Sequence, residues 1–280
     1  MTKIKIVTDS TADLTAEDIK KYNIEIVPLT ITIDGQAFTD RVDITPIEFL
    51  EKMQSADELP KTSQPSTGVF LEVYDRLFEE GYEIISIHMT GGMSGTVRSA
   101  ESAAQMAKGK VTVVDSRYIS KALSFQVLEA AELVVKGVGV QEIVEHLQHV
   151  QQQSRLYIMV DTLENLVKGG RIGKGRALIG SLLNIKPIAS LEGGEYSPVG
   201  KVRSHSQVLK YLMKQFAEDI KGKTVKRVGI AHAEAQNLAA KLKDEIVELT
   251  GFQQIEIDYT TPVISTHTGK GALALMYYFD

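Results

Sequence analysis

The segment Tyr82-Glu-Ile-Ile-Ser-Ile-His88 is followed directly by Met89-Thr-Gly-Gly-Met-Ser-Gly-Thr-Val-Arg98. The first segment is apolar enough for a buried strand, and Val97 to Met106, rich in Ala, Ser and Glu, predicts a helix. Glycines in the connecting turn let the backbone approach a ligand and adopt positive φ without penalty. A strand that passes through such a turn into a helix directs unpaired backbone N–H groups at one point. The stretch therefore predicts a βα unit with an anion pocket at its turn.

An ordinary βα loop is the alternative interpretation of this turn. Ser94 and Thr96 place hydroxyls where the backbone N–H groups converge, which suits a carboxylate or phosphate ligand. Ser and Thr are equally common as helix caps. Since glycine-rich turns occur in many folds, the spacing alone leaves both interpretations open.

The rest of the chain alternates predicted strands and helices. A short buried strand over 3–8 ends in the polar Asp9-Ser10-Thr11, and a second over 110–114 ends in Asp115. In open α/β sheets, ligands bind beyond the carboxyl ends of the strands. Thr45-Pro46-Ile47-Glu48 is a capping box that predicts a helix to about Met53. This order is typical of a parallel sheet with helices on both sides.

The glutamine run Gln151–Gln153 indicates a boundary between two domains. We predict an α/β fold of two lobes, with a parallel-sheet N-terminal domain over 1–153 and a mixed α/β C-terminal domain over 154–280. In the second domain we expect a short helix over 177–183 and a strand hairpin over 185–202.

Composition limits the function further. The chain has 280 residues, of which 43% are hydrophobic and 24% charged, as in an ordinary globular protein. It contains no cysteine, which excludes disulfides, thiolate nucleophiles and Cys-based zinc sites. No segment approaches the ~20 apolar residues of a membrane span, and the first residues lack the apolar core of a signal peptide. We therefore expect a cytoplasmic protein, and the net charge of −5 argues against broad nucleic-acid binding.

Three further segments carry groups that suit a ligand or a partner. The loop over 61–66 has three hydroxyls, which either cap the next helix or contact a ligand. Residues 168–176 combine four cations with four glycines and no acid, as in a solvated loop or a docking site for phosphate or an acidic partner. His267, between Thr266 and Thr268, is expected to be a hydrogen-bond donor or acceptor in a loop.

Taken together, these segments resemble the DegV family of bacterial fatty-acid-binding proteins. The matching motifs, in the order of the family, are Thr8–Leu14, Thr62–Ser66, Met93–Thr96, Asp115-Ser116, Lys168–Arg171 and Ser265–Gly269. Each motif alone is weak, but together they cover essentially the whole chain as one unit from about residue 3 to residue 279.

The resemblance implies one fatty acid held between the two lobes. The family's carboxylate contacts carry over onto Thr62, Ser94 and His267 and onto the backbone around Gly95 and Thr96. The acyl tail is expected in the C-terminal domain. No catalytic residue, metal or cofactor of its own is implied.

The resemblance also implies protein partners. Members of this kind act as the binding subunit of a fatty acid kinase: a separate ATP-dependent kinase subunit phosphorylates the bound carboxyl group. The acyl phosphate then goes to an acyltransferase that feeds phospholipid synthesis, which leaves room for transient contact with a membrane surface. Arg171 and Arg203 match the positions expected to dock the kinase subunit. No nucleic-acid partner is implied.

The sequence departs from the family pattern at two places. The segment His88–Gly92 replaces a more serine-rich lead-in, and Lys270 stands where proline is usual. We expect Lys270 to add a positive charge close to the head-group site.

Two alternative functions use the same residues. A serine hydrolase or acyltransferase would use Ser94 as nucleophile, activated by His267 with Asp9 or Asp115. However, Gly92-Met93-Ser94-Gly95-Thr96 lacks the final glycine of the nucleophile elbow. A sugar- or dihydroxyacetone-handling relative would use His267 as a covalent or phosphorylated site.

Overall fold

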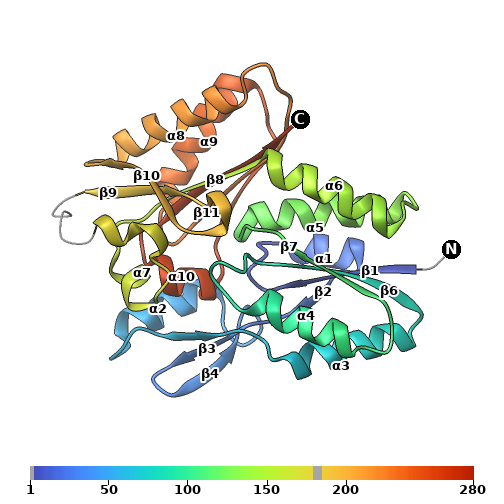
Figure 1. Ribbon diagram of the computed structural model, residues 1–280. Helices are drawn as coiled ribbons and strands as arrows, with labels where there is room; N and C mark the ends of the chain where they lie inside the picture. The colour runs from blue at the N-terminus through green and yellow to red at the C-terminus, as the bar shows by residue number, and fades with distance from the viewer. Residues whose placement is uncertain (1–2, 179–184) are drawn as a thin grey trace.

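Apolar strands alternate with helices through the first part of the chain and build a parallel sheet. The structure is a computed structural model that describes residues 3–178 and 185–280 (Figure 1). The strands of this sheet are β1 (Lys3–Asp9), β2 (Glu25–Val27), β6 (Tyr82–His88) and β7 (Val111–Asp115). They lie in the order β2-β1-β6-β7, and each neighbouring pair is parallel.

Helices cover both faces of the parallel sheet, so its strands are apolar on both sides. The helices are α1 (Ala16–Tyr22), α3 (Thr67–Glu79), α4 (Thr96–Met106), α5 (Ser120–Val135) and α6 (Val140–Gln153). Ile84 packs with Phe70 of α3 and Ala100 of α4, whereas its neighbour Ile85 belongs to the cluster that contains Leu123 of α5. Figure 1 shows α3 and α4 on one side of the sheet and α5 and α6 on the other.

A small antiparallel sheet and a capped helix lie beside this layer. The sheet has the order β4-β3-β5 and consists of β3 (Thr30–Ile33), β4 (Gln36–Thr39) and β5 (Lys61–Ser63). Helix α2 (Pro46–Ser55) begins with the predicted capping box: the Thr45 hydroxyl accepts from the Glu48 backbone, and the Glu48 carboxylate accepts from the Thr45 backbone. Helix α2 packs against α10 (Pro262–Thr268), which comes from the other end of the chain.

The second half of the chain forms a mixed sheet in the order β10-β9-β8-β13-β11-β12. Its strands are β8 (Ser154–Met159), β9 (Lys186–Ser190), β10 (Ser197–Val202), β11 (Val225–His232), β12 (Ile255–Tyr259) and β13 (Leu273–Phe279). The pair β11–β12 is parallel and the other neighbours are antiparallel. Helices α8 (His205–Asp219) and α9 (Gln236–Thr250) cover one face. A parallel sheet and a mixed sheet within one α/β fold confirm the predicted fold class.

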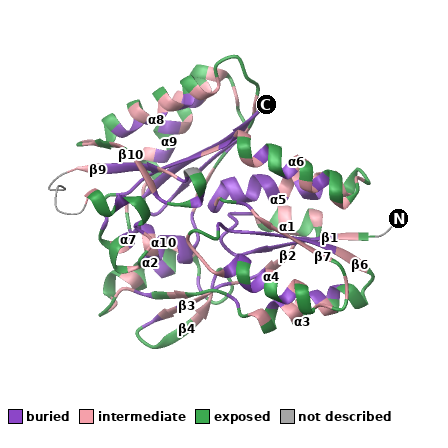
Figure 2. Ribbon diagram, viewed as in Figure 1, coloured by how far each residue is buried: buried purple, intermediate pink, exposed green. Residues whose placement is uncertain are grey.

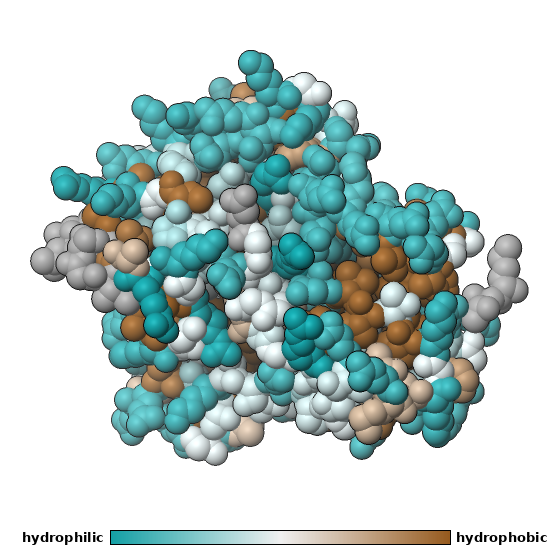
Figure 3. Space-filling model, viewed as in Figure 1, coloured by the Kyte–Doolittle hydropathy of each residue, from teal (hydrophilic) through white to brown (hydrophobic). Residues whose placement is uncertain are grey.

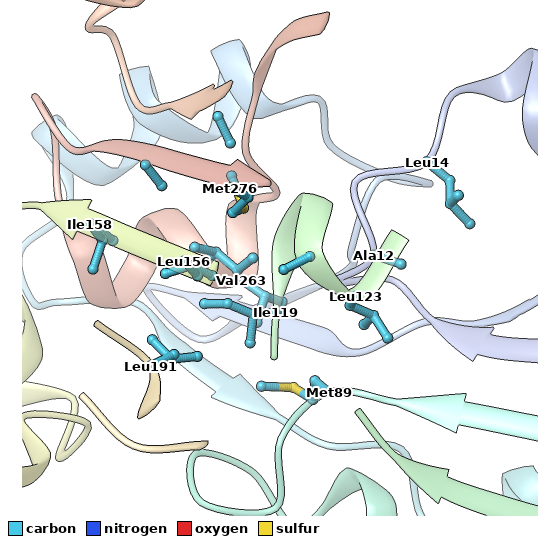
Figure 4. Packing of buried hydrophobic residues seen from close by; sticks show 14 of the residues in the cluster. Ala12, Leu14, Met89, Ile119, Leu123, Leu156, Ile158, Leu191, Val263 and Met276 are labelled. Atoms are coloured by element: carbon cyan, nitrogen blue, oxygen red, sulfur yellow. The ribbon is translucent and has the colours of Figure 1, made fainter. Parts of the chain in front are cut away.

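Helix α5 lies between the two sheets. It contacts β1 and β6 of the parallel sheet and β8, β11 and β13 of the mixed sheet. Every residue from Ser120 to Val127 is buried, and Figure 2 shows this helix as one of the most continuously buried segments. The same apolar cluster joins Leu123 to Met276 of β13 (Figure 4).

Strand β7 forms one edge of the parallel sheet. Each of its residues is only partly buried, although three of the five are valines. Figure 3 shows apolar side chains gathered on this part of the surface, between α6 and α4. In the described part of the chain, no helix is long and apolar enough to cross a membrane.

Several shorter elements complete the chain. They are α7 (Glu164–Lys168) and the 3-10 helices η1 (Gly173–Leu178) and η2 (Glu192–Gly194). Most of the helix predicted over 177–183 lies outside the described residues. Helix α6 ends at Gln153 and β8 begins at Ser154, and the division into domains 1–153 and 154–280 stays a prediction.

Candidate functional site

A cavity of about 300 Å³ is lined by residues from both halves of the chain. This volume lies at the lower end of the ~300–1,000 Å³ of small-molecule sites. The apolar part of the wall consists of Leu29, Met89, Met93, Ile119, Ile158, Leu166, Leu191, Val263 and Ile264. Figure 4 shows Met89, Ile119, Ile158, Leu191 and Val263 converging on a common space. A mostly aliphatic cavity of this kind suits an aliphatic ligand.

The sequence-predicted residues Thr62, Ser94 and His267 all line this cavity. Thr62 lies on β5 and His267 on the last turn of α10, and Thr62 Oγ1 lies 2.8 Å from His267 Nε2. His267 is therefore on a helix, and the prediction of a loop was wrong. The Thr261 side chain caps α10, and Pro262 occupies its first turn. These two signals start a helix in a Thr-rich segment that resembles a loop.

His267 is neutral at pH 7. Burial, together with the nearby charge of Arg171, lowers the pKa of His267 from 6.5 to about 4. Its Nδ1 is buried and has no hydrogen-bond partner among the described residues. In the tautomer with the proton on Nε2, the ring donates to Thr62, which leaves the Thr62 hydroxyl hydrogen free to donate to an anion.

The turn between β6 and α4 confirms the predicted βα unit. Ser94 Oγ lies 2.8 Å from Thr96 Oγ1 and accepts a hydrogen bond from the Thr96 backbone at 3.3 Å. Ser94 thus bonds within the turn and also lines the cavity. The N-cap of α4 is Gly95, without a side-chain capping hydrogen bond, so the interpretation as a Ser or Thr helix cap was wrong. Gly95 and Thr96 do not themselves line the cavity, and Thr96 is fully buried.

The glycines of this turn are needed for close packing, and the expected positive φ was wrong. Gly91, Gly92 and Gly95 all have φ outside the left-handed region. A Cβ on Gly92 would lie 2.6 Å from the Gly194 carbonyl oxygen, and one on Gly95 would lie 2.2 Å from Oε1 of Gln64. The backbone therefore makes close approaches to η2 and to the Gln64 side chain.

The two arginines expected to dock a partner lie in different surroundings. Arg171 lines the cavity and is partly buried; its Nε donates to the Met93 carbonyl at 3.1 Å, and its Nη1 donates to the Gly169 carbonyl at 2.6 Å. Arg203 is exposed, and its backbone N–H donates to the Gln207 side chain at 2.8 Å. Arg171 thus ties the segment after α7 to the β6–α4 turn.

Lys270 does not lie at the head-group site. Its ammonium forms an ion pair with Glu234 at 2.5 Å, and it lines a separate groove that also includes Asp161 and His205. The expectation of an extra positive charge beside the carboxylate was therefore wrong, because Glu234 compensates the charge locally.

Asp9 and Asp115, the two acids that could complete a catalytic triad with Ser94 and His267, form hydrogen bonds with other groups. Asp9 accepts from the Met89 backbone at 2.9 Å and lies 3.1 Å from Nδ1 of His88. Burial alone would raise the pKa of Asp9, but the hydrogen bonds from His88 and its neighbours hold it below the usual value. Asp115 accepts from the backbone N–H groups of Gly91 and Arg117. In the described part of the chain, no acid forms a hydrogen bond or ion pair with His267.

The sequence did not indicate two other residues of the wall. Gln64 lies over the β6–α4 turn and donates to Ser99, and Tyr196 is almost fully buried. The Tyr196 hydroxyl is buried without a partner among the described residues, and burial raises its pKa above the usual value. Gln64 lies in the predicted Thr62–Ser66 motif, in which only the hydroxyls suggested a role, and no local pattern marks Tyr196. Both side chains reach the cavity through long-range packing. The described residues also contain no group of three or more His, Asp and Glu side chains that could hold a metal ion.

Comparisons with known proteins identify the family of this chain. A family model described as "Uncharacterised protein, DegV family" matches residues 3–280. A DegV domain-containing protein of Listeria innocua is 46% identical over 281 residues, covering 100% of both chains.

Two solved structures are similar over nearly the whole chain. One, described as fatty acid binding of a DegV family protein from Thermus thermophilus, has a TM-score of 0.94, 33% identity and 99% coverage of both chains. The other, DegV, a fatty acid binding protein from Bacillus subtilis, has a TM-score of 0.91, 32% identity and 100% coverage of both chains. The chain therefore belongs to the DegV family.

Proposed function

We propose that this protein binds one long-chain fatty acid in the cavity and presents its carboxylate to a separate kinase subunit. The observation that carries the proposal is the hydrogen-bonded pair Thr62–His267, which lies with Ser94 in the wall of a cavity whose other lining residues are mostly aliphatic. The similar proteins of Thermus thermophilus and Bacillus subtilis, whose descriptions state fatty acid binding, support the ligand class.

The tail supplies most of the affinity in this proposal. Burying ~15 methylenes at ~0.8 kcal/mol each gives a gross gain of about 12 kcal/mol. Losses of translational and conformational freedom remove several kcal/mol of that gain. Ile158, Leu166 and Leu191 give the tail its apolar contacts in the C-terminal half of the chain.

The head group is held by uncharged donors. The hydroxyls of Thr62 and Ser94, together with His267, would orient the carboxylate. The backbone around Gly95 and Thr96 does not line the cavity and would act through Ser94, whose Oγ accepts from the Thr96 N–H. Breaking a buried ion pair leaves an uncompensated charge, which is strongly unfavourable. Uncharged donors therefore hold the carboxylate and leave it available for reaction, while the Arg171 guanidinium in the same wall is bonded to the Met93 and Gly169 carbonyls.

The protein itself catalyses no reaction in this proposal, and it needs no metal or cofactor. A carboxylate oxygen attacks the γ-phosphorus of ATP on the kinase subunit, and the bond from that phosphorus to the ADP oxygen breaks. The products are ADP and an acyl phosphate, which passes to an acyltransferase for phospholipid synthesis. In this proposal the kinase subunit docks on Arg203, and Arg171 contributes from a position nearer the cavity. The protein is placed in the cytoplasm, where it makes transient contact with a membrane surface.

Mass spectrometry of an organic extract of the purified protein tests the ligand class first. We expect about one equivalent of a long-chain fatty acid per chain. The double variant Thr62→Val, Ser94→Ala removes two head-group donors and should retain less fatty acid than the wild type. Its circular dichroism spectrum should be unchanged, which would show that the variant is still folded. An extract without fatty acid, also after incubation of the protein with added fatty acids, would refute the proposal.

A further inference from the structure

A second hollow shares its wall with the cavity. It is a surface depression of about 370 Å³, and Met93, Arg171 and Tyr196 line both spaces. Its charged residues are Arg171, Lys174, Arg176 and Glu195. We call this hollow the basic depression.

The basic depression carries an excess of positive charge on a protein whose net charge is −5. Three cationic residues and one acidic residue, Glu195, line it. Lys174 and Arg176 are exposed, and neither forms an ion pair within residues 3–178 and 185–280. Unpaired cations around a hollow attract an anion of more than one negative charge.

The common wall lies at the polar end of the cavity. Met93 directly precedes Ser94, and its carbonyl accepts a hydrogen bond from Arg171. Arg171 also bonds the Gly169 carbonyl and lies close enough to His267 to help lower the pKa of that imidazole. A group that extends outward from a carboxylate held by Ser94 and His267 would therefore pass beside Arg171.

The wall also contains an unsatisfied donor. Tyr196 is 2% exposed, and its hydroxyl has no hydrogen-bond partner among the described residues. A buried polar group without a partner costs about 1–3 kcal/mol. A ligand oxygen near the common wall would remove that cost.

We propose that the basic depression binds the phosphoryl group of an acyl phosphate whose chain occupies the cavity. This inference rests on the proposed function and adds a product site to it. Phosphorylation turns a singly charged carboxylate into a group with about two negative charges and three strong acceptor oxygens. Arg171, Lys174 and Arg176 supply the additional positive charge, and arginine suits phosphoryl oxygens because it donates two parallel hydrogen bonds. The site would retain the product after the kinase subunit has left.

Calorimetric titration of two ligands with the same chain, hexadecanoic acid and hexadecyl phosphate, tests the inference. The double variant Lys174→Gln, Arg176→Gln removes two charges of the basic depression and leaves Arg171 in place. We expect it to weaken hexadecyl phosphate binding about tenfold, or about 1.4 kcal/mol, and hexadecanoic acid binding less than twofold. Lys20→Gln is the matched control, because Lys20 is an exposed lysine on α1 in the parallel-sheet half of the chain. This variant should bind both ligands like the wild type.

Four outcomes would overturn the inference. If the double variant binds both ligands equally more weakly, its cations attract anions in general. If it binds neither ligand more weakly, these cations have no role in binding. Lost retention on anionic phospholipid vesicles, with unchanged affinity for hexadecyl phosphate, would assign the cations to a lipid surface. A wild type that binds hexadecanoic acid but not hexadecyl phosphate contradicts this inference alone, whereas one that binds neither contradicts the proposed function.

Discussion

The substitution Gly169→Ala tests the head-group site without removing any of its polar groups. A Cβ on Gly169 would lie 2.2 Å from Nδ1 of His267 and 2.9 Å from the Asn165 carbonyl oxygen. Gly169 has φ of −77°, which alanine adopts freely, so the backbone conformation itself is not strained. The methyl group must therefore displace the His267 ring from its 2.8 Å contact with Thr62.

The expected loss follows from the hydrogen bond that the ring supports. A hydrogen bond to a charged group contributes about 1.5–3 kcal/mol, so fatty acid affinity should fall roughly ten- to hundredfold. Calorimetric titration with hexadecanoic acid measures this change, and the imidazole signals of His267 in NMR spectra report whether the ring has moved.

Gly139→Ala is the matched control. Gly139 has φ of −78° and open space beside its Cα, so an added methyl group meets nothing within 4 Å. We expect wild-type affinity for this variant. Wild-type affinity for Gly169→Ala, combined with a displaced His267 ring, would refute the assignment of His267 to the carboxylate.

Three further predictions concern the same protein. Ser94→Ala should weaken fatty acid retention about tenfold by removing one donor to the carboxylate, and unchanged binding and unchanged kinase turnover would together contradict the placement of the head group. His267 has a folded-state pKa of about 4 against 6.5 unfolded, so the unfolded chain binds the proton more readily. Its contribution to stability is present above pH 6.5 and is lost as the pH falls toward 4, by up to about 3 kcal/mol. In urea titrations, the free energy of unfolding of the wild type should therefore fall more steeply between pH 6.5 and pH 4 than that of His267→Asn. Arg203→Glu should leave fatty acid affinity unchanged and lower acyl phosphate formation with the kinase subunit roughly tenfold, or about 1.4 kcal/mol; equal rates in a coupled ADP assay would exclude Arg203 from docking.

The fold was largely predictable, because its signals are local. The apolar run Tyr82–His88 and the helix that follows the glycine turn both appear where the sequence indicates them. The capping box at Thr45 likewise starts α2 at the predicted residue. Each of these predictions depends on residues that lie within one or two turns of one another. Hydrophobic periodicity and capping residues are therefore sufficient to predict these elements.

The candidate site was predictable in its residues but not in its geometry. Thr62 and His267 are 205 positions apart, and Arg171 reaches Met93 across 78 positions. Such contacts depend on how the two sheets pack, which no local pattern encodes. Family resemblance supplied Thr62 and His267 as separate contacts of a carboxylate, and only the structure shows the hydrogen bond between them. Tyr196 carries no motif, and its buried hydroxyl marks it only in the structure.

The helix between the two sheets restricts how a ligand enters and leaves. Because α5 packs against strands of both sheets, a hinge motion that separated the halves would expose its buried residues to water. Exposure of apolar surface costs about 25 cal/mol per Å², so this route opposes rapid exchange. The short helix α7, which carries Leu166, lies outside that sandwich and buries only this residue, whereas α10 is buried in six of its seven residues. Ligand exchange is therefore expected to proceed by local displacement of α7 while the sheets, α5 and α10 remain together as a rigid frame.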